Sequence, residues 1–142
     1  MVATRFAVAI HILLLLACNR TEGKATSEFL ARSVNTNPVV VRRITGQLAR
    51  AGLIRVRRGP GGAELARHPA EISLGDVWRA MNVGSSRPLL PLHASPDPGC
   101  PVGREVHTVL GGAFEAAELA MQQALSRTTL DSLVRGLLKE AA

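Results

Sequence analysis

The sequence contains few aromatic residues: they make up 3% of its 142 residues, and tyrosine is absent. Proteins that bind single-stranded nucleic acids stack bases on aromatic side chains, so this class of function is disfavoured. Cysteine is equally scarce. Cys18 and Cys100 are the only two, which excludes a disulfide framework and a metal-binding CxxC pair. A reduced, cytoplasmic setting is the simpler expectation for such a chain.

Long apolar runs are also missing. The longest, from Phe6 to Cys18, is shorter than the roughly 20 apolar residues that a membrane span needs, so no membrane association is expected. Arg5 and the Leu-Leu-Ala-Cys sequence at 15–18 nevertheless resemble a lipoprotein signal, and an exported, lipid-anchored basic protein processed before Cys18 is the alternative interpretation. Helical spacing favours instead a first helix that packs on the next two, through Phe6, Ile10, Leu13, Leu14 and Ala17.

Two short helical patterns, separated by a polar turn, occupy residues 26–51. Thr26 or Ser27 can cap the first helix. In the turn, Asn37 is a good N-cap, and Pro38 fits the first turn of the second helix, where its missing N–H costs nothing. Such a pair of helices predicts a helix-turn-helix, whose second helix enters the major groove of DNA.

A basic hairpin is predicted after the second helix. Residues 53–57 alternate apolar with basic side chains, as a half-buried strand does, and the Gly-Pro-Gly-Gly sequence at 59–62 turns the chain back. Seven arginines and one acid lie between Arg42 and Arg67, in a chain whose net charge is +6. Arginines spread over a helix and a hairpin in this way favour a phosphate-binding surface over an ordinary solvated face.

The second half of the chain predicts a loop and a long helix. Five of the eight prolines lie within residues 83–103, which show no periodicity. Residues 104–125 then return to helical spacing, and we expect their apolar stripe to pack against a second copy of the helix; packing against its own domain is the alternative. The stripe contains Val106, Val109, Leu110, Ala113, Phe114, Ala117, Met121 and Ala124.

The predicted fold class is mainly α with a small β-hairpin wing. A winged helix-turn-helix domain is expected over residues 1–82, with its wing at about 53–66. A proline-rich sensor loop over 83–103 and a dimerisation helix followed by a C-terminal helix over 104–142 complete the predicted chain.

Several segments together resemble the Rrf2 family of bacterial winged-helix transcriptional regulators, most of which are repressors. They are residues 35–44, 51–54, 58–62, 72–77 and 100–103, and the resemblance covers essentially the whole chain. It implies a homodimer in which the helix at 104–125 crosses that of its partner. It also implies contacts with the major groove from the start of the second helix and with the minor groove from Arg58. The candidate DNA-binding residues are Thr26, Ser27, Asn37, Val39, Val40, Arg42, Arg43, Arg57, Arg58 and Gly59.

The chain departs from the family members that bind an iron–sulfur cluster, because those carry three closely spaced cysteines in the loop. Only Cys100 lies there, and one thiolate cannot replace the usual four ligands, so no cofactor and no metal are expected. Its place just before a helix and near Arg104 favours a thiolate that oxidises, which makes Cys100 a candidate sensor. A structural cysteine packed under the loop, with Cys18 buried in the first helix, is equally compatible, and a small-molecule effector is a third alternative.

A catalytic role for Cys100 is not expected. The nearest candidate base, His107, lies seven residues away, which on one helix is about two turns, or roughly 10 Å. That is too far for a hydrogen-bonded nucleophile and base, and no orienting group is identifiable. The sequence therefore predicts a DNA-binding transcriptional regulator and not an enzyme.

Overall fold

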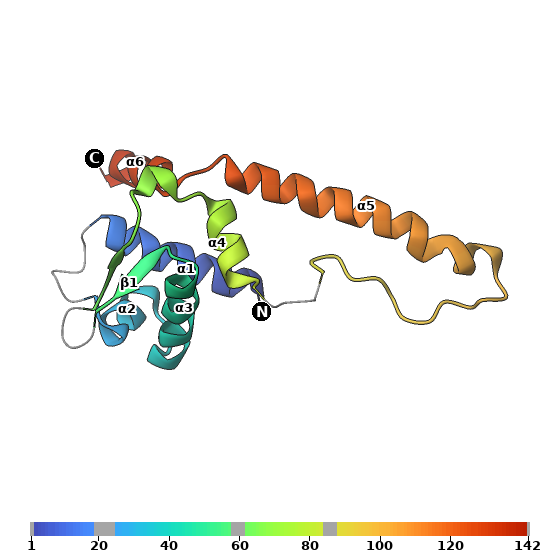
Figure 1. The fold of residues 1–142 in the computed structure, drawn as a ribbon, viewed down its shortest axis with the longest axis horizontal. Coiled ribbons are helices and arrows are strands. Elements are labelled where there is room, and N and C mark those ends of the chain that lie inside the picture. The colour runs from blue at the N-terminus through green and yellow to red at the C-terminus, as the bar shows by residue number, and fades with distance from the viewer. Residues whose placement is uncertain (1, 19–24, 58–61, 84–87, 142) are drawn as a thin grey trace.

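The computed structural model describes residues 2–18, 25–57, 62–83 and 88–141. Within them the chain is mainly helical, with one antiparallel hairpin, as predicted (Figure 1). The elements are α1 Val2–Ala17, α2 Ser27–Val34, α3 Pro38–Arg50, β1 Ile54–Val56, β2 Ala63–Leu65, the short 3₁₀ helix η1 Pro69–Glu71, α4 Leu74–Met81, α5 Pro101–Ser126 and α6 Leu130–Ala141. All of them except α5 gather into one body, from which α5 extends away (Figure 1).

The core of this body lies between α1, α3 and α4. Ile12 and Leu13 of α1 are completely buried, as are Ile44 and Leu48 of α3. The first helix packs on the two helices that follow it, as predicted. Of the predicted stripe, Leu13 is fully buried, whereas Phe6, Ile10, Leu14 and Ala17 are half-buried; the other buried residues of α1 are Ala9, Ile12 and Leu16. Since α1 is apolar on nearly every side, its periodicity alone could not fix which side faces inward. Cleavage before Cys18 would remove these side chains from the core.

No helix among the described residues is long and apolar enough to cross a membrane. The aromatic contact in the body joins the first helix to the fourth: the rings of Phe6 and Trp78 meet edge to face, with their centroids 5.1 Å apart. Trp78 thus takes the core position that its amphipathic helix implies.

The caps of the helix-turn-helix follow the sequence. Thr26 is the N-cap of α2, and its hydroxyl accepts a hydrogen bond from the Phe29 N–H. Asn35 ends that helix in the left-handed conformation, at φ 56°. The Asn37 side chain accepts from the Val39 N–H at 2.8 Å, and Pro38 opens α3. These local interactions set the turn that orients α3.

The hairpin pairs Ile54 with Leu65 and Arg55 with Glu64. The predicted alternation holds only in part, because Leu53 and Ile54 are both buried while Val56 is 56% exposed. Burial of Leu53 and Ile54 follows from their contact with the core, and Val56 lies beyond it. The turn of the hairpin, including Arg58 and Gly59, lies outside the described residues.

The junction between α4, α5 and α6 is closely packed. Leu74 donates its N–H to the Thr128 carbonyl at 2.8 Å, and Leu130 donates to the Ile72 carbonyl at 2.9 Å, which forms a short antiparallel bridge. A methyl group on Gly75 would collide with the Ser126 hydroxyl and lie 3.1 Å from the Ser126 Cα. The end of α5 is therefore held directly against the start of α4.

The start of α4 is closed by a capping box of Ser73 and Asp76. Burial raises the pKa of the Asp76 carboxyl. Hydrogen bonds from the Ser73 N–H and the Arg79 guanidinium outweigh that effect and hold the pKa of Asp76 below its ordinary value.

The long helix begins earlier than predicted. It starts at Pro101 with Cys100 as N-cap, so the expected start at residue 104 is wrong by three residues. Proline is well suited to a first helical turn, but among so many prolines and glycines this local signal was not distinctive. The pair Gly111 and Gly112 does not interrupt the helix, and an added Cβ at either residue would meet nothing within 4 Å. No residue of α5 is buried.

Candidate nucleic-acid interface

The start of α2, the exposed side of α3 and the hairpin border a hollow of about 290 Å³. Four of the predicted DNA-binding residues line it: Thr26, Ser27, Arg42 and Arg57. Two segments far apart in the sequence approach each other here, since the N–H of Ala63 in β2 donates to the carbonyl of Ala25, just before α2, at 3.1 Å. The fold thus brings together side chains that the sequence indicated separately.

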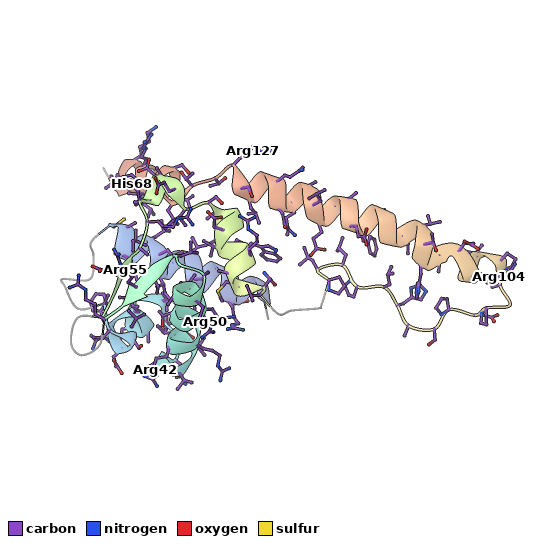
Figure 2. The ribbon with its side chains drawn as sticks, in the orientation of Figure 1. Arg42, Arg50, Arg55, His68, Arg104 and Arg127 are labelled. Atoms are coloured by element: carbon purple, nitrogen blue, oxygen red, sulfur yellow. The ribbon has the colours of Figure 1, made fainter. Side chains whose placement is uncertain are left out.

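The outer side of α3 carries the remaining helical candidates. Val39 is 50% exposed, and Asn37 and Arg43 are exposed as well. Val40 is half-buried and packs against the core, so it presents less surface than its neighbour. Figure 2 shows Arg42 and Arg50 on α3 and Arg55 on the hairpin, all at the surface of the same body. Positively charged groups on α3 and on the hairpin therefore border the exposed part of the helix-turn-helix.

Three arginines of this surface, Arg42, Arg55 and Arg57, form ion pairs with acidic side chains. The Arg42 guanidinium lies 3.6 Å from the Glu28 carboxylate across the gap between α2 and α3. On the hairpin, Nη2 of Arg57 donates to both carboxylate oxygens of Glu64, at 3.1 and 3.0 Å. Nε of Arg55 lies 3.6 Å from the same carboxylate. In the free protein these arginines are thus paired with carboxylates.

The candidate residues named from the sequence do not include Thr45, Glu28 or Glu64, and Arg55 was counted only as one of the seven arginines of the basic surface. Thr45 is buried behind the hollow, and its hydroxyl donates to the Arg42 carbonyl at 3.1 Å. A period of two along β1 places Arg55 on the same face of the hairpin as Arg57, so this candidate could have been found from the strand pattern. The pairing of Glu28 with Arg42 depends on how two helices pack, and no local signal reveals it.

The second candidate site is the start of α5. Cys100 is exposed there, whereas Cys18 is half-buried and follows the end of α1; the prediction that Cys18 is buried within the first helix is wrong. Leu14 and Leu15 beside it are only half-buried, because the last turn of α1 lies at the edge of the core. His107 is engaged with the preceding loop: its Nε2 lies 2.7 Å from the His93 carbonyl oxygen, and the two rings pack edge to face.

With this geometry established, the family can be assigned. The family model described as Rrf2, iron-dependent transcriptional regulator, matches residues 2–136. The chain belongs to the Rrf2 family. Rrf2 proteins are transcriptional regulators and not enzymes, so the predicted family, fold and class of function are confirmed.

Individual relatives agree with the assignment. The "Putative HTH-type transcriptional regulator YwnA" of Bacillus subtilis (strain 168) is 42% identical over 137 residues, which cover 96% of this chain and 99% of YwnA. A crystal structure of "a putative DNA binding protein" is 40% identical with a TM-score of 0.73, and the match covers 91% of this chain and 97% of that one. The structure of CymR (YrzC), the global cysteine regulator of B. subtilis, is 25% identical with a TM-score of 0.61, covering 93% and 94%.

The family description mentions iron, and the start of α5 in this Rrf2 chain offers one thiol as a possible donor. Cys100 is the only thiol at the start of α5, and iron–sulfur clusters are held mainly by several thiolates. Within the part of the chain that the structure describes, no three His, Cys, Asp or Glu side chains come together as a metal site.

Proposed function

We propose that this Rrf2 protein is a homodimeric repressor, acting in the cytoplasm, that binds a pseudo-palindromic DNA duplex. The observation that carries the proposal is the exposure of α5. This helix of 26 residues has no buried residue, although Val106, Val109, Ala113 and Ala117 share one side of it. Val109 is 69% exposed. A contiguous apolar face of this kind is typical of an interaction site, and a second copy of α5 would cover it.

A dimer explains how a small DNA-binding surface on each subunit can suffice for sequence-specific binding. Each copy presents one α3 helix and one hairpin, and a single short helix reads only a few base pairs. Asn37, Val39 and Arg42 are the side chains we assign to the major groove, and Arg42 can donate two hydrogen bonds to a guanine. Arg43 and Arg57, with Thr26 and Ser27 at the start of α2, contact phosphates in this proposal.

Selection from a pool of random duplexes tests this function. We expect the selected sequences to contain two inverted half-sites whose centres are separated by one helical turn, about 10 base pairs, or a multiple of it. Binding should weaken steeply with salt, with a slope in log–log form of about −0.9 for each phosphate that the protein neutralises. Selected sequences with one half-site, or with no advantage over random duplex, would contradict the proposal.

We further propose that oxidation of Cys100 changes the affinity for DNA. The thiol is exposed at the N-cap of α5, where its side chain makes no capping hydrogen bond, so both oxidants and a partner thiol can reach it. Its neighbours Pro101 and Val102 belong to the first turn of the helix that we assign to the dimer contact. A modification there therefore alters the end of the interface.

Treatment with hydrogen peroxide, which oxidises a thiolate to a sulfenic acid and is itself reduced to water, tests this second proposal. Affinity of the wild-type protein for the selected duplex should change by roughly tenfold, within the range of ordinary allosteric coupling, and should return after reduction. Cys100→Ser should bind the duplex and no longer respond, whereas the matched Cys18→Ser should respond like the wild type. An unaltered response in Cys100→Ser would remove Cys100 from the mechanism.

A further inference from the structure

The arginine-rich surface contains two acids, and both are paired with arginines. Between Ala25 and Arg67 the sequence has no acidic residue except Glu28 and Glu64. Glu28 lies opposite Arg42 of α3, and Glu64 lies opposite Arg55 in the hairpin register. Two of the elements that border the hollow, α2 and the hairpin, thus each contribute a carboxylate to a surface whose other charges are positive.

These pairs contribute little to folding. The side chains of Arg42 and Glu28 are 55% and 67% exposed, and those of Arg57 and Glu64 are 64% and 42% exposed. Ion pairs with this much access to water are screened by solvent and have small effects on stability. Their main physical consequence is therefore electrostatic: they decide which arginine N–H groups are available to an approaching phosphate.

The geometry at Glu64 shows the competition most clearly. Nη2 of Arg57 donates to both carboxylate oxygens, and its Nε donates to one of them at 3.3 Å. A phosphate that approaches the same Nε–Nη2 edge has to displace the carboxylate before it can accept two hydrogen bonds from that edge. The displaced carboxylate then remains close to a polyanion, which adds repulsion.

We propose that Glu28 and Glu64 are specificity-determining residues, which weaken the binding of arbitrary DNA more than that of the operator. Non-specific binding is almost entirely electrostatic, so it bears the full effect of the two carboxylates. In an operator complex, base contacts contribute additional binding free energy, which offsets the free-energy cost of displacing the two carboxylates. The inference rests on the proposed function, because it assigns the surface around Arg42 and Arg57 to DNA.

Isosteric substitutions test the inference. Glu28→Gln and Glu64→Gln remove one negative charge each, and we expect each to raise affinity for a random 20-base-pair duplex by roughly fivefold at 0.1 M salt. The log–log salt slope should steepen by up to about 0.9, the contribution of one more phosphate contact. Affinity for the duplex selected by the wild-type protein should rise less, so that the ratio of selected to random affinity falls.

Glu140→Gln is the matched control. It changes the net charge by the same amount, but Glu140 lies on α6, on the side of the body away from α3 (Figure 1). If the two test variants bind random duplex no more tightly than Glu140→Gln, the inference is wrong. Weaker binding by Glu64→Gln would also overturn it, since Glu64 would then hold Arg57 in a productive position.

The test of the proposed function is separate from the test of this inference. It depends on whether the wild-type protein prefers a selected duplex over a random one, whereas the inference depends on the difference between Glu→Gln variants. Thermal unfolding of all variants provides the folding check. Because the ion pairs are exposed, the melting temperatures of the variants should stay close to that of the wild-type protein.

Discussion

A chain carrying Val109→Glu and Ala113→Glu is expected to be monomeric and to lose at least about a hundredfold in affinity for its selected duplex. These residues lie one turn apart on the exposed apolar face of α5. In a symmetric dimer the two substitutions place four carboxylates in one apolar contact, where unpaired charges are costly. A monomer reads one half-site, and the loss of bivalent binding alone is worth about 10² to 10⁴ in affinity.

Sedimentation velocity and titration of a labelled duplex measure the two effects. Thr108→Glu is the matched control, because Thr108 is exposed on the same helix and, by helical spacing, points away from this face. The control should remain dimeric with unchanged affinity. A double variant that stays dimeric would show that the copies associate through another surface, and would remove the main support for the proposed homodimer.

Gly75→Ala is expected to destabilise the protein by about 1–3 kcal/mol, the usual effect of inserting a methyl group into a well-packed contact. The added carbon would collide with the Ser126 hydroxyl and approach the Ser126 Cα to 3.1 Å. Either the end of α5 or the start of α4 has to move. In the proposed dimer α5 joins the two copies, and α4 packs on α3, so the preferred spacing between half-sites should change as well.

Denaturant unfolding and repeated duplex selection check this prediction. Ser126→Gly removes the side chain that the methyl group meets, so the double variant Gly75→Ala with Ser126→Gly should lose less stability than the sum of the two single variants. Gly111→Ala is the matched control on α5, because an added Cβ there meets nothing within 4 Å. Additive losses in the double variant would show that the contact between Gly75 and Ser126 is not the origin of the effect.

Local chemistry made the DNA-binding part predictable from sequence. Asn37 and Pro38 determine the start of α3 through interactions within a few residues, and the structure has both as predicted. The hairpin was predictable for the same reason, since strand alternation and a glycine-rich turn are local signals. Features that depend on packing were not, since the inward side of α1 and the position of Cys18 were predicted incompletely or wrongly. The start of α5 was missed for another reason, because the local proline signal was not distinctive.

The candidate site shows the same division. Arg42 and Arg57 could be assigned from their elements, because a helix in the major groove and a basic wing require such residues. Their carboxylate partners could not, since Glu28 and Arg42 belong to different helices and meet only when these pack. The roles of Arg58 and Gly59 and the predicted domain limits remain predictions.

The closely packed junction at Gly75 also bears on what a modification of Cys100 could do by tilting α5. The helix α5 separates the two by 26 residues, a lever arm of about 39 Å. A displacement of roughly 2 Å at its far tip corresponds to a tilt of only about 3° over that length. Because α3 lies close to the junction about which α5 would tilt, such a tilt would move α3 by only a small part of the displacement at the tip of α5. If two copies pair through α5 as proposed, we therefore expect a chemical change at Cys100 to act by altering the separation of the two long helices, which shifts each recognition domain as a whole.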